Sequence, residues 1–523
     1  PVLGGWSERV AWGGSLLEMA PGPDPMIWLR REDGVVGWGC AAQIVLHGPD
    51  RIARAAAWWE EVVARAEVSD EVGTSTSGLI ALGSFAFDDA SPQPSMLVVP
   101  SVIVGKKGAV RWITRVTALG EPQPTAPGQG APSAEPTCAA AEPNRPAEPT
   151  HTPTTPPDPA PGQGAVRWST RVTALGEPQP TAPGQGAPSA EPTCATDAPG
   201  GPAGPQAAVE PNRPAEPTHT PTSAPTLAPG QGAAPAGGRS GWGWPGVVRW
   251  GEGERRAEEW PGTISEAIRA IEAGEADKVV LARDEWAIAD QPFDLRAVAD
   301  HLARAYPSCW TYGIGGMVGA TPELLVRSSH GLVTSRVLAG TIQQTDDDVA
   351  NLARAAALAR SSKDLEEHEF AVASVAQSLA EFTEELSVPE VPYVLHLANV
   401  MHLASDVAGV LRQGEERPSS LRLAGALHPT AAVCGTPTDA ARRLLARLEG
   451  SDRGGYAGPV GWINAAGDGE WGIALRGAQL SADRRRARLF AGGGIVRASV
   501  PEAELAETEA KLAPMRSALA PRA

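Results

Sequence analysis

The stretch Ala491-Gly-Gly-Gly-Ile-Val-Arg-Ala-Ser-Val-Pro-Glu-Ala-Glu-Leu-Ala-Glu-Thr-Glu-Ala-Lys511 carries the pattern around which the rest of the chain is organised. It predicts the end of a strand at 488–490, a turn at the three glycines 492–494, and then a helix. Ser499 followed by Glu502 three residues later forms a capping box, so the predicted helix begins at Ser499.

Two kinds of charged group would meet at this predicted turn. Glu504, Glu507 and Lys511 have the spacing of residues on one helical face. Glycine backbone N–H groups can receive an anion, and glycine lets the backbone approach a ligand closely. Carboxylates beside an anion site suggest a divalent metal ion between them. The alternative interpretation is an ordinary glycine turn followed by a solvated Glu/Lys face.

Composition narrows the class of protein. The chain has 523 residues, 42% of them hydrophobic, which is enough for a sizeable core, and a formal net charge of −17. Such an acidic chain is a poor candidate for binding nucleic acid or an anionic membrane surface. The sequence shows neither a signal-peptide pattern nor a long uncharged apolar run. We therefore expect a cytoplasmic monomer with a small-molecule substrate.

The chain divides into three segments. Residues 1–118 show strand and helix patterns, and Val110-Arg-Trp-Ile-Thr-Arg-Val is expected to belong to a sheet. Residues 119–240 are rich in Pro, Ala and Gly, and the repeat that starts at Gly108 recurs from Gly164 with one difference. We interpret this segment as a disordered insert whose second repeat copy has no strand partner. Residues 241–523 again show a folded pattern.

Within the last segment, strands alternate with amphipathic helices. Helices are expected at 263–273, 295–306, 348–384 and 438–448. Strands are expected at 278–283, 310–319, 323–328 and 332–337, as a strand pair over 400–411, and as a hairpin around 467–469. Runs of strands that can pair antiparallel, with helices between them, indicate an α+β fold rather than a doubly wound parallel sheet.

Two ionisable residues adjoin apolar strand patterns. Lys278 begins the run Val-Val-Leu-Ala, where it could snorkel to solvent or, with its pKa lowered by burial, act as a general base. Glu323 follows Gly319-Ala-Thr-Pro and precedes Leu-Leu-Val. Burial there would raise the pKa of the carboxyl and suit it to a general acid, whereas the alternative is a solvent-facing strand end.

A third candidate lies inside the long predicted helix. Lys363 and Glu367 are four residues apart and could form an ordinary surface ion pair. The functional interpretation assigns Glu367 to a metal ion, while His368 is more often structural. The chain has no CxxC pair and no His/Cys cluster. Carboxylate ligands therefore favour Mg²⁺ over zinc.

Taken together and in this order, the motifs resemble the chorismate-utilising enzyme family, and most closely its isochorismate synthases. The resemblance is dense over 260–516 and weak over 1–118. The matching segments are Asp277-Lys-Val-Val-Leu-Ala-Arg, Gly319-Ala-Thr-Pro-Glu-Leu-Leu-Val, Val337-Leu-Ala-Gly-Thr, Ser362-Lys-Asp-Leu-Glu-Glu-His, Met401-His-Leu, Leu427-His-Pro-Thr, Gly455-Tyr-Ala-Gly-Pro-Val-Gly-Trp, Ile473-Ala-Leu-Arg and the opening stretch.

This resemblance implies a fold and a reaction. The fold is that of anthranilate synthase component I, in which large antiparallel sheets pack as a sandwich with helices outside, and residues 1–118 complete the same domain as 241–523. The reaction is the Mg²⁺-dependent isomerisation of chorismate to isochorismate. By resemblance, Lys278 activates the water that attacks ring C2, and Glu323 protonates the departing C4 hydroxyl.

The resemblance also implies binding residues. Glu367 and Glu507 match the family's Mg²⁺ positions, with Glu504 in support. The positions that match substrate-binding residues are His402, Thr341, Tyr456, Arg476, Gly492, Gly494 and Lys511.

Two residues favour water as the nucleophile. Family members that use ammonia tend to carry glutamine at the position of Lys278, and aminodeoxychorismate synthases carry lysine at the position of Ala339. Salicylate synthase, which goes on to eliminate pyruvate, and a non-catalytic chorismate-binding paralogue stay open as alternatives. The product could serve menaquinone or siderophore synthesis. Ala431, where the family commonly has proline, and Gly493, where alanine is frequent, depart from the family pattern.

Deleting residues 122–238 and bridging the ends with a short Gly/Ser linker should leave activity within about tenfold of the intact chain, because long surface insertions are tolerated. Chorismate turnover and circular dichroism of the deletion variant test this. Loss of folding would contradict the interpretation of the segment as a disordered insert.

Overall fold

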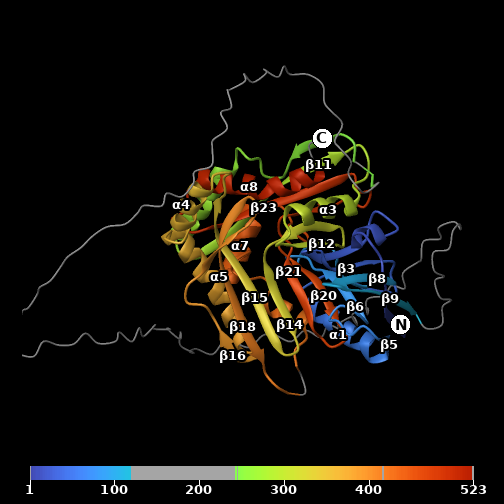
Figure 1. Cartoon of the computed structure of the whole chain (residues 1–523). Helices are drawn as coiled ribbons and strands as arrows, with labels where there is room; N and C mark the ends of the chain where they lie inside the picture. Colours follow the sequence, from blue (N-terminus) through green and yellow to red (C-terminus); the bar gives the residue numbers. More distant parts are fainter. Residues whose placement is uncertain (1, 119–241, 244, 415–416, 521–523) are drawn as a thin grey trace, which may run out of the picture. The chain divides into compact units, whose positions relative to one another are not determined.

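The computed structural model describes residues 2–118, 242–243, 245–414 and 417–520 (Figure 1). They belong to one compact unit. The predicted insert, its disorder and the missing strand partner of its second repeat copy lie outside the described residues. None of the described helices is long and apolar enough to cross a membrane.

Two large sheets form the framework, and all but one of their strand pairs are antiparallel. The first sheet has 13 strands in the order β10-β11-β23-β22-β13-β12-β2-β3-β8-β9-β1-β5, with β19 also paired to β11. Only β1 and β5 pair parallel. The bounds of its strands are β1 Leu3–Arg9, β2 Met26–Arg30, β3 Asp33–Trp38, β5 Glu67–Asp70, β8 Val102–Lys107, β9 Val110–Ala118, β10 Val248–Glu252, β11 Lys278–Ala289, β12 Trp310–Ile314, β13 Met317–Thr321, β19 Gly435–Thr436, β22 Gly477–Leu480 and β23 Arg486–Ile495.

The second sheet has ten strands in the order β16-β18-β15-β14-β21-β20-β6-β7-β4, with β17 paired to β18. The bounds of its strands are β4 Ala42–Leu46, β6 Ile80–Ser84, β7 Ser95–Val99, β14 Leu324–Ser329, β15 Leu332–Gln343, β16 Thr383–Ser387, β17 Tyr393–His396, β18 Val400–Leu411, β20 Pro459–Asn464 and β21 Gly469–Ile473.

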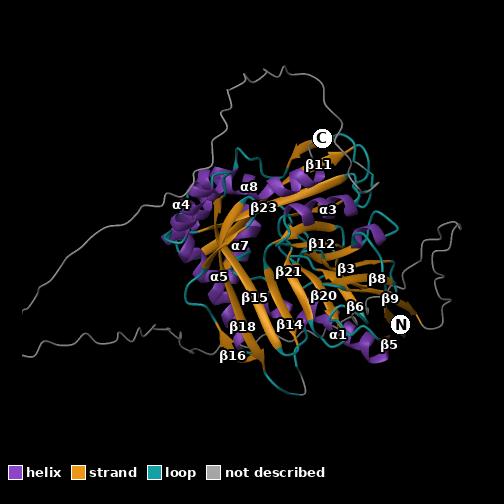
Figure 2. Ribbon diagram, viewed as in Figure 1, coloured by secondary structure: helices purple, strands orange, loops and turns teal. Residues whose placement is uncertain are grey.

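The helices lie around the two sheets (Figure 2). Their bounds are η1 Leu16–Met19, α1 Arg51–Arg65, α2 Trp260–Glu272, α3 Leu295–Ala305, α4 Asp348–Leu358, α5 Ser362–Ala380, α6 Ser420–Leu427, α7 Thr438–Leu448 and α8 Pro501–Leu519. Together with the antiparallel sheets, this arrangement confirms the predicted α+β class.

An apolar core joins the two sheets. One cluster of buried side chains takes Trp112 and Tyr312 from the first sheet and Leu82, Leu324 and Val460 from the second. Burial of large apolar side chains on both inner faces is the main favourable contribution to such a sandwich. The predicted strand around Val110 is β9, which pairs with β8 and β1.

The glycines of the opening stretch do not form a turn. Gly492, Gly493 and Gly494 lie inside β23, where they pair antiparallel with Ala282, Leu281 and Val280. The prediction of a three-glycine turn is therefore wrong. The glycines continue the strand through their pairing with β11, and Gly494 also leaves room for buried charged side chains, as described below.

The predicted start of the last helix is also wrong. Helix α8 begins at Pro501, with Val500 as its N-cap residue and no side-chain cap. The Ser499 hydroxyl instead accepts a hydrogen bond from the Val496 backbone N–H at 3.3 Å. Proline suits the first helical position because it has no N–H to leave unsatisfied.

Three other segments were predicted with the wrong number of helices or strands. The single helix expected over 348–384 is two helices, and the Ser361 hydroxyl caps the second by accepting from the Asp364 N–H. The strand pair expected over 400–411 is the single strand β18. The strand expected over 310–319 is a hairpin that turns at Gly315 and Gly316, both of which have positive φ angles.

Candidate active site

A cavity between the two sheets encloses about 650 Å³ of empty volume, including space open to solvent. Strands β11 and β23 of the first sheet and β15 and β18 of the second contribute to its wall, with Lys511 from α8. Nine of the twelve site residues expected from the sequence line it: Glu323, Thr341, Glu367, His402, Tyr456, Arg476, Gly492, Gly494 and Lys511. The other three do not line it: Lys278 pairs with the lining residue Glu367, Glu507 pairs with the lining residue Lys511, and Glu504 pairs with Lys363.

Glu323 reaches the cavity from a link between the two sheets. Strand β13 belongs to the first sheet and β14 to the second, and Pro322 and Glu323 join them. The side chain is buried, and burial raises the pKa of its carboxyl to about 8, against the opposing effects of a backbone hydrogen bond from Leu338 and the charge of Lys278. A carboxyl that is protonated at neutral pH can donate a proton.

Lys278 is fully buried at the start of β11. Its Nζ donates to the Glu367 backbone carbonyl at 3.1 Å and lies 3.6 Å from the Glu367 carboxylate. Burial lowers the pKa of this ammonium, while the charge of Glu367 acts in the opposite direction. The alternative of a lysine that snorkels to solvent is therefore wrong, and the neutral amine needed for a general base is favoured by desolvation.

Gly494 makes this packing possible. A Cβ at this position would overlap the Glu367 carboxylate and would lie 3.0 Å from Cε of Lys278. At Gly493 a Cβ would lie 2.9 Å from Oε2 of Glu504, which is the far end of a flexible side chain. Gly494 is therefore required for β23 to approach Lys278 and Glu367 closely. At position 493 an added Cβ could be accommodated if the Glu504 carboxylate moved.

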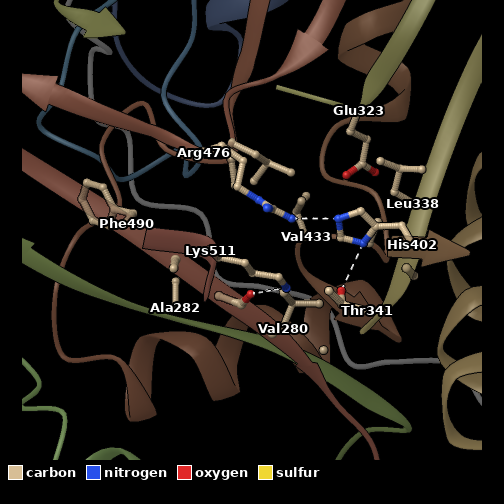
Figure 3. A pocket seen from close by; sticks show the side chains of 18 of the residues that line it. Val280, Ala282, Glu323, Leu338, Thr341, His402, Val433, Arg476, Phe490 and Lys511 are labelled. Atoms are coloured by element: carbon tan, nitrogen blue, oxygen red, sulfur yellow. Dashed lines mark hydrogen bonds between the residues drawn. The ribbon is translucent and has the colours of Figure 1, made fainter. Parts of the chain in front are cut away.

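Arg476, His402 and Thr341 form a hydrogen-bonded row across the cavity (Figure 3). The Arg476 guanidinium donates to Nε2 of His402 at 2.9 Å, and Nδ1 of His402 lies 3.1 Å from the Thr341 hydroxyl. Burial and the Arg476 charge keep the His402 pKa well below its ordinary value. The imidazole is thus neutral, accepts from arginine at one nitrogen, and holds the guanidinium in place.

The backbone at Arg476 explains how this side chain reaches the cavity. Its φ of 49° lies in the left-handed region, which is uncommon for a residue with a Cβ. The residue lies between β21 of the second sheet and β22 of the first, where the chain crosses back. The sharp change of direction at this crossing presents the guanidinium to the space between the sheets.

Lys511 and Tyr456 complete the polar lining. Nζ of Lys511 donates to the Gly492 carbonyl at 2.7 Å and lies 2.5 Å from the Glu507 carboxylate. The Tyr456 ring stacks on Phe490 with ring centroids 5.0 Å apart. Burial raises the pKa of the Tyr456 hydroxyl to about 12. The hydroxyl therefore stays protonated and can donate to an anionic ligand.

The three carboxylates expected to bind metal lie near Lys363. Its Nζ is 3.0 Å from Oε1 of Glu504 and 3.9 Å from Oε2 of Glu367. Burial and the charge of Glu507 raise the pKa of Glu504 to about 7, and Oε2 of Glu504 is buried without a hydrogen-bond partner. Burial also opposes ionisation of Glu507, but Lys511 and Lys363 hold its pKa below the ordinary value.

These oxygen donors have the chemistry that Mg²⁺ prefers. An orphaned carboxylate oxygen on Glu504 also fits a cation site. Among the described residues, however, no group of three or more His, Cys, Asp or Glu side chains is arranged to hold a metal ion. The ammonium of Lys363 partly balances the carboxylate charge in this arrangement.

The structure excludes one alternative interpretation of the sequence and adds one lining residue that the sequence analysis missed. Lys363 and Glu367 are not the surface ion pair that their spacing suggested, because both side chains are largely buried. Arg453 lines the cavity, donates to the Val433 and Val280 carbonyls, and pairs with Glu449. Its position two residues before the matched motif that begins at Gly455 was the available signal. His368 is structural, as expected, and bonds the Ser405 hydroxyl at 2.9 Å.

Comparison with known proteins agrees with this geometry. The sequence family described as "Chorismate binding enzyme" matches residues 249–520. The isochorismate synthase DhbC of Bacillus subtilis is 38% identical over 273 residues, which cover 50% of this chain and 68% of that protein. The salicylate biosynthesis isochorismate synthase of Pseudomonas aeruginosa is 37% identical over 277 residues, which cover 51% of this chain and 56% of that protein.

A solved structure shows the same fold. The menaquinone-specific isochorismate synthase MenF of Escherichia coli aligns with a TM-score of 0.62 at 20% identity, over 99% of this chain and 95% of that chain. The antiparallel sandwich expected from the sequence is thereby confirmed.

Gly494→Ala should lower the free energy of unfolding by about 1–3 kcal/mol, because its Cβ would overlap two buried charged side chains. Gly493→Ala is the matched control and should change stability by less than about 1 kcal/mol, because only a carboxylate end must move. Urea denaturation of both variants measures the difference. Equal stability of the two would show that β23 has room beside Lys278 and Glu367.

Proposed function

The chain belongs to the chorismate-binding enzyme family, and we propose that it is an isochorismate synthase that isomerises chorismate by adding water at ring C2 and releasing the C4 hydroxyl. The names of its relatives support the reaction. Within the cavity, the observation that carries the proposal is the burial of one amine and one carboxyl whose pKa values shift in opposite directions.

Burial favours the neutral form of both groups. The pKa of Lys278 is lowered and that of Glu323 is raised to about 8, in each case chiefly by desolvation. A neutral amine can take a proton from water, and a protonated carboxyl can give one to a departing hydroxyl. Glu323 would thus be protonated at neutral pH, and desolvation shifts Lys278 toward the neutral amine that the proposed reaction requires.

The lining cations suit a dianionic substrate. Arg476 and Lys511 lie on the cavity wall, and Figure 3 shows Glu323 on one side of the Arg476–His402 pair and Lys511 on the other. We infer that these two cations and the Tyr456 hydroxyl bind the substrate carboxylates, with the Gly492 and Gly494 amides close by. His402 and Thr341 would orient the guanidinium rather than react.

We infer that Mg²⁺ is required. Glu367, Glu504 and Glu507 would hold it, and the bound ion would offset the repulsion between these carboxylates and a substrate carboxylate. Lys363 and the ion would share the Glu504 carboxylate, because Lys363 lies 3.0 Å from Oε1 and Oε2 has no hydrogen-bond partner in the protein.

Water is the nucleophile favoured by two positions. Ala339 lines the cavity, so a lysine at this position, as in aminodeoxychorismate synthases, would project into it. Lys278 occupies the position where ammonia-using relatives tend to carry glutamine. A cytoplasmic location and a monomeric state stay predictions.

Incubating the intact protein with chorismate and Mg²⁺, and separating the products, tests the proposed reaction. Isochorismate alone is the expected product. Salicylate with pyruvate would show that the same cavity also eliminates the side chain. Binding of chorismate without turnover would identify a non-catalytic paralogue and overturn the proposal.

Lys278→Ala should lower kcat by at least about 10²-fold, because it removes the proposed base. Binding of Mg²⁺, measured by calorimetry, and the circular dichroism spectrum should be retained. Lys107→Ala, at an exposed lysine outside the cavity, is the control for loss of a positive charge and should keep full activity. Undiminished turnover by Lys278→Ala would remove Lys278 from this role.

The rate should fall as pH rises through about 8. Glu323 has a raised pKa, so its protonated form is present below that pH and is lost above it. At low pH the rate should also fall as Lys278 gains a proton, although its lowered pKa moves this limb below the ordinary lysine range. A profile of kcat/KM from pH 6 to 10, with folding checked at each pH, measures both limbs. A rate that kept rising beyond pH 9 would exclude Glu323 as the acid.

A further inference from the structure

A short segment from the N-terminal part of the chain packs against the candidate active site. Residues 85–89 follow β6. The Phe85 N–H donates to the Pro459 carbonyl at 2.9 Å, and the Phe87 N–H donates to the Gly454 carbonyl at 2.8 Å. The Phe87 side chain is buried. This segment lies outside the part of the chain that the family match covers, which begins at residue 249.

Phe87 contacts a charged residue of the cavity wall. The guanidinium of Arg453 lies over the Phe87 ring, 4.4 Å from its centroid, and over the Tyr456 ring, 6.0 Å from its centroid. Tyr456 in turn stacks on Phe490, and both of these rings line the cavity. Because a guanidinium is attracted to the face of an aromatic ring, these contacts link the N-terminal part of the chain to the tyrosine proposed to bind a substrate carboxylate.

The Arg453 guanidinium is engaged at all three of its nitrogens. Nε and one terminal nitrogen donate to the two carboxylate oxygens of Glu449, and the terminal nitrogens also donate to the Val433 and Val280 carbonyls. Burial opposes the charge of Arg453, but Glu449 holds the pKa of the guanidinium above its ordinary value. Arg453 is thus a cation of the cavity wall whose donors are directed at the protein rather than at a ligand.

The Arg453–Glu449 pair closes a gap along one edge of β11. On this side, β11 pairs with β19 only at residues 278 and 279, and with β10 only over residues 285–289. Within the gap, the Val280 carbonyl accepts from Arg453, and the Ala282 N–H donates to Oε1 of Glu449 at 2.7 Å. Unpaired backbone groups are costly when they are buried. The two side chains therefore take the place of a neighbouring strand.

The backbone held in this way belongs to the wall of the cavity. Val280, Ala282 and Val433 all line the candidate active site (Figure 3). Among the described residues, Arg453 and Glu449 form hydrogen bonds and ion pairs with neither Lys278 nor Glu323. A change at Arg453 is therefore expected to move the wall and Tyr456 while the proposed acid and base stay in place.

We propose that Phe87, Arg453 and Glu449 form a positioning unit through which the N-terminal part of the chain fixes the substrate-binding wall. Phe87 holds the guanidinium against Tyr456, and the guanidinium and Glu449 hold the edge of β11. The inference rests on the proposed function only in taking chorismate as the ligand of this cavity. Loss of the Phe87 contact displaces groups that bind the substrate and the transition state alike, so KM should rise with little change in kcat.

Steady-state kinetics of the intact protein with chorismate and Mg²⁺ test this unit, with chorismate consumption followed whatever the product. Phe87→Leu should raise KM about fivefold to tenfold and keep kcat within about threefold, because leucine offers no ring face to the guanidinium. Phe87→Tyr keeps the ring and should hold KM within about twofold of the unaltered protein. Phe85→Leu is the matched control: it removes a buried ring that packs on Trp471, and KM should not change.

Arg453→Lys is the second variant, because an ammonium cannot replace the planar fork that bridges Glu449 and two carbonyls, and it should raise KM at least about fivefold. Circular dichroism and thermal unfolding establish that each variant is folded, and Arg453→Lys decides the matter if Phe87→Leu does not fold. An unchanged KM in either folded variant, or an equal rise in Phe85→Leu, would contradict the positioning role. If the unaltered protein binds chorismate without turnover, the proposed function fails, and the same variants are then compared by the Kd for chorismate from calorimetry.

Discussion

The missing side chain at Gly494 is the constraint on which the site depends. It lets β23 pass so close to β11 and α5 that Lys278 and Glu367 are buried together. A buried ammonium is costly unless it is paired or loses its proton, and here both compensations act, because Glu367 is near and the pKa is lowered. A Cβ at this position would overlap the Glu367 carboxylate and lie 3.0 Å from Cε of Lys278, so this pair could not keep its present packing.

The topology of the sandwich is the second feature on which the candidate active site depends. The chain leaves one sheet for the other at Pro322 and Glu323 and returns at Arg476. Links of this kind place side chains in the space between sheets without using the inward positions of a strand, which the core needs for packing. The proposed acid and a substrate-binding cation therefore enter one cavity from segments about 150 residues apart, and neither position is available until both sheets have formed.

These features explain what the sequence could predict. The helix α7 and the hairpin of β20 and β21 depend on periodicity and on the turn at Gly467, which are local, and both were predicted. The glycines at 492–494 were misread, because a glycine run is a turn signal locally and its contact with Glu367 belongs to the tertiary structure. The surface and buried alternatives for Lys363 stayed open for a similar reason, since i,i+4 spacing is the same on an exposed face and a buried one. Local patterns had already singled out Lys278, Glu323, Glu367 and the opening stretch, whereas His402, Thr341, Tyr456 and Arg476 were assigned only by the family resemblance. The roles of all twelve site residues stay predictions.

Burial of the proposed acid in the cavity, and of the proposed base beside its lining residue Glu367, has a further consequence. In water, Lys278 and Glu323 would both be charged, but desolvation shifts both pKa values toward the neutral forms. An ion pair between them would favour the charged forms instead and would abolish their use as base and acid. The structure avoids this, because the closest carboxylate to Lys278 is that of Glu367, at 3.6 Å. Glu367 thus limits how far the lysine pKa falls, while Glu323 keeps its proton, and the same carboxylate is available to a metal ion. A cation at Glu367 would weaken its hold on Lys278, so metal binding and the basicity of Lys278 are expected to be linked.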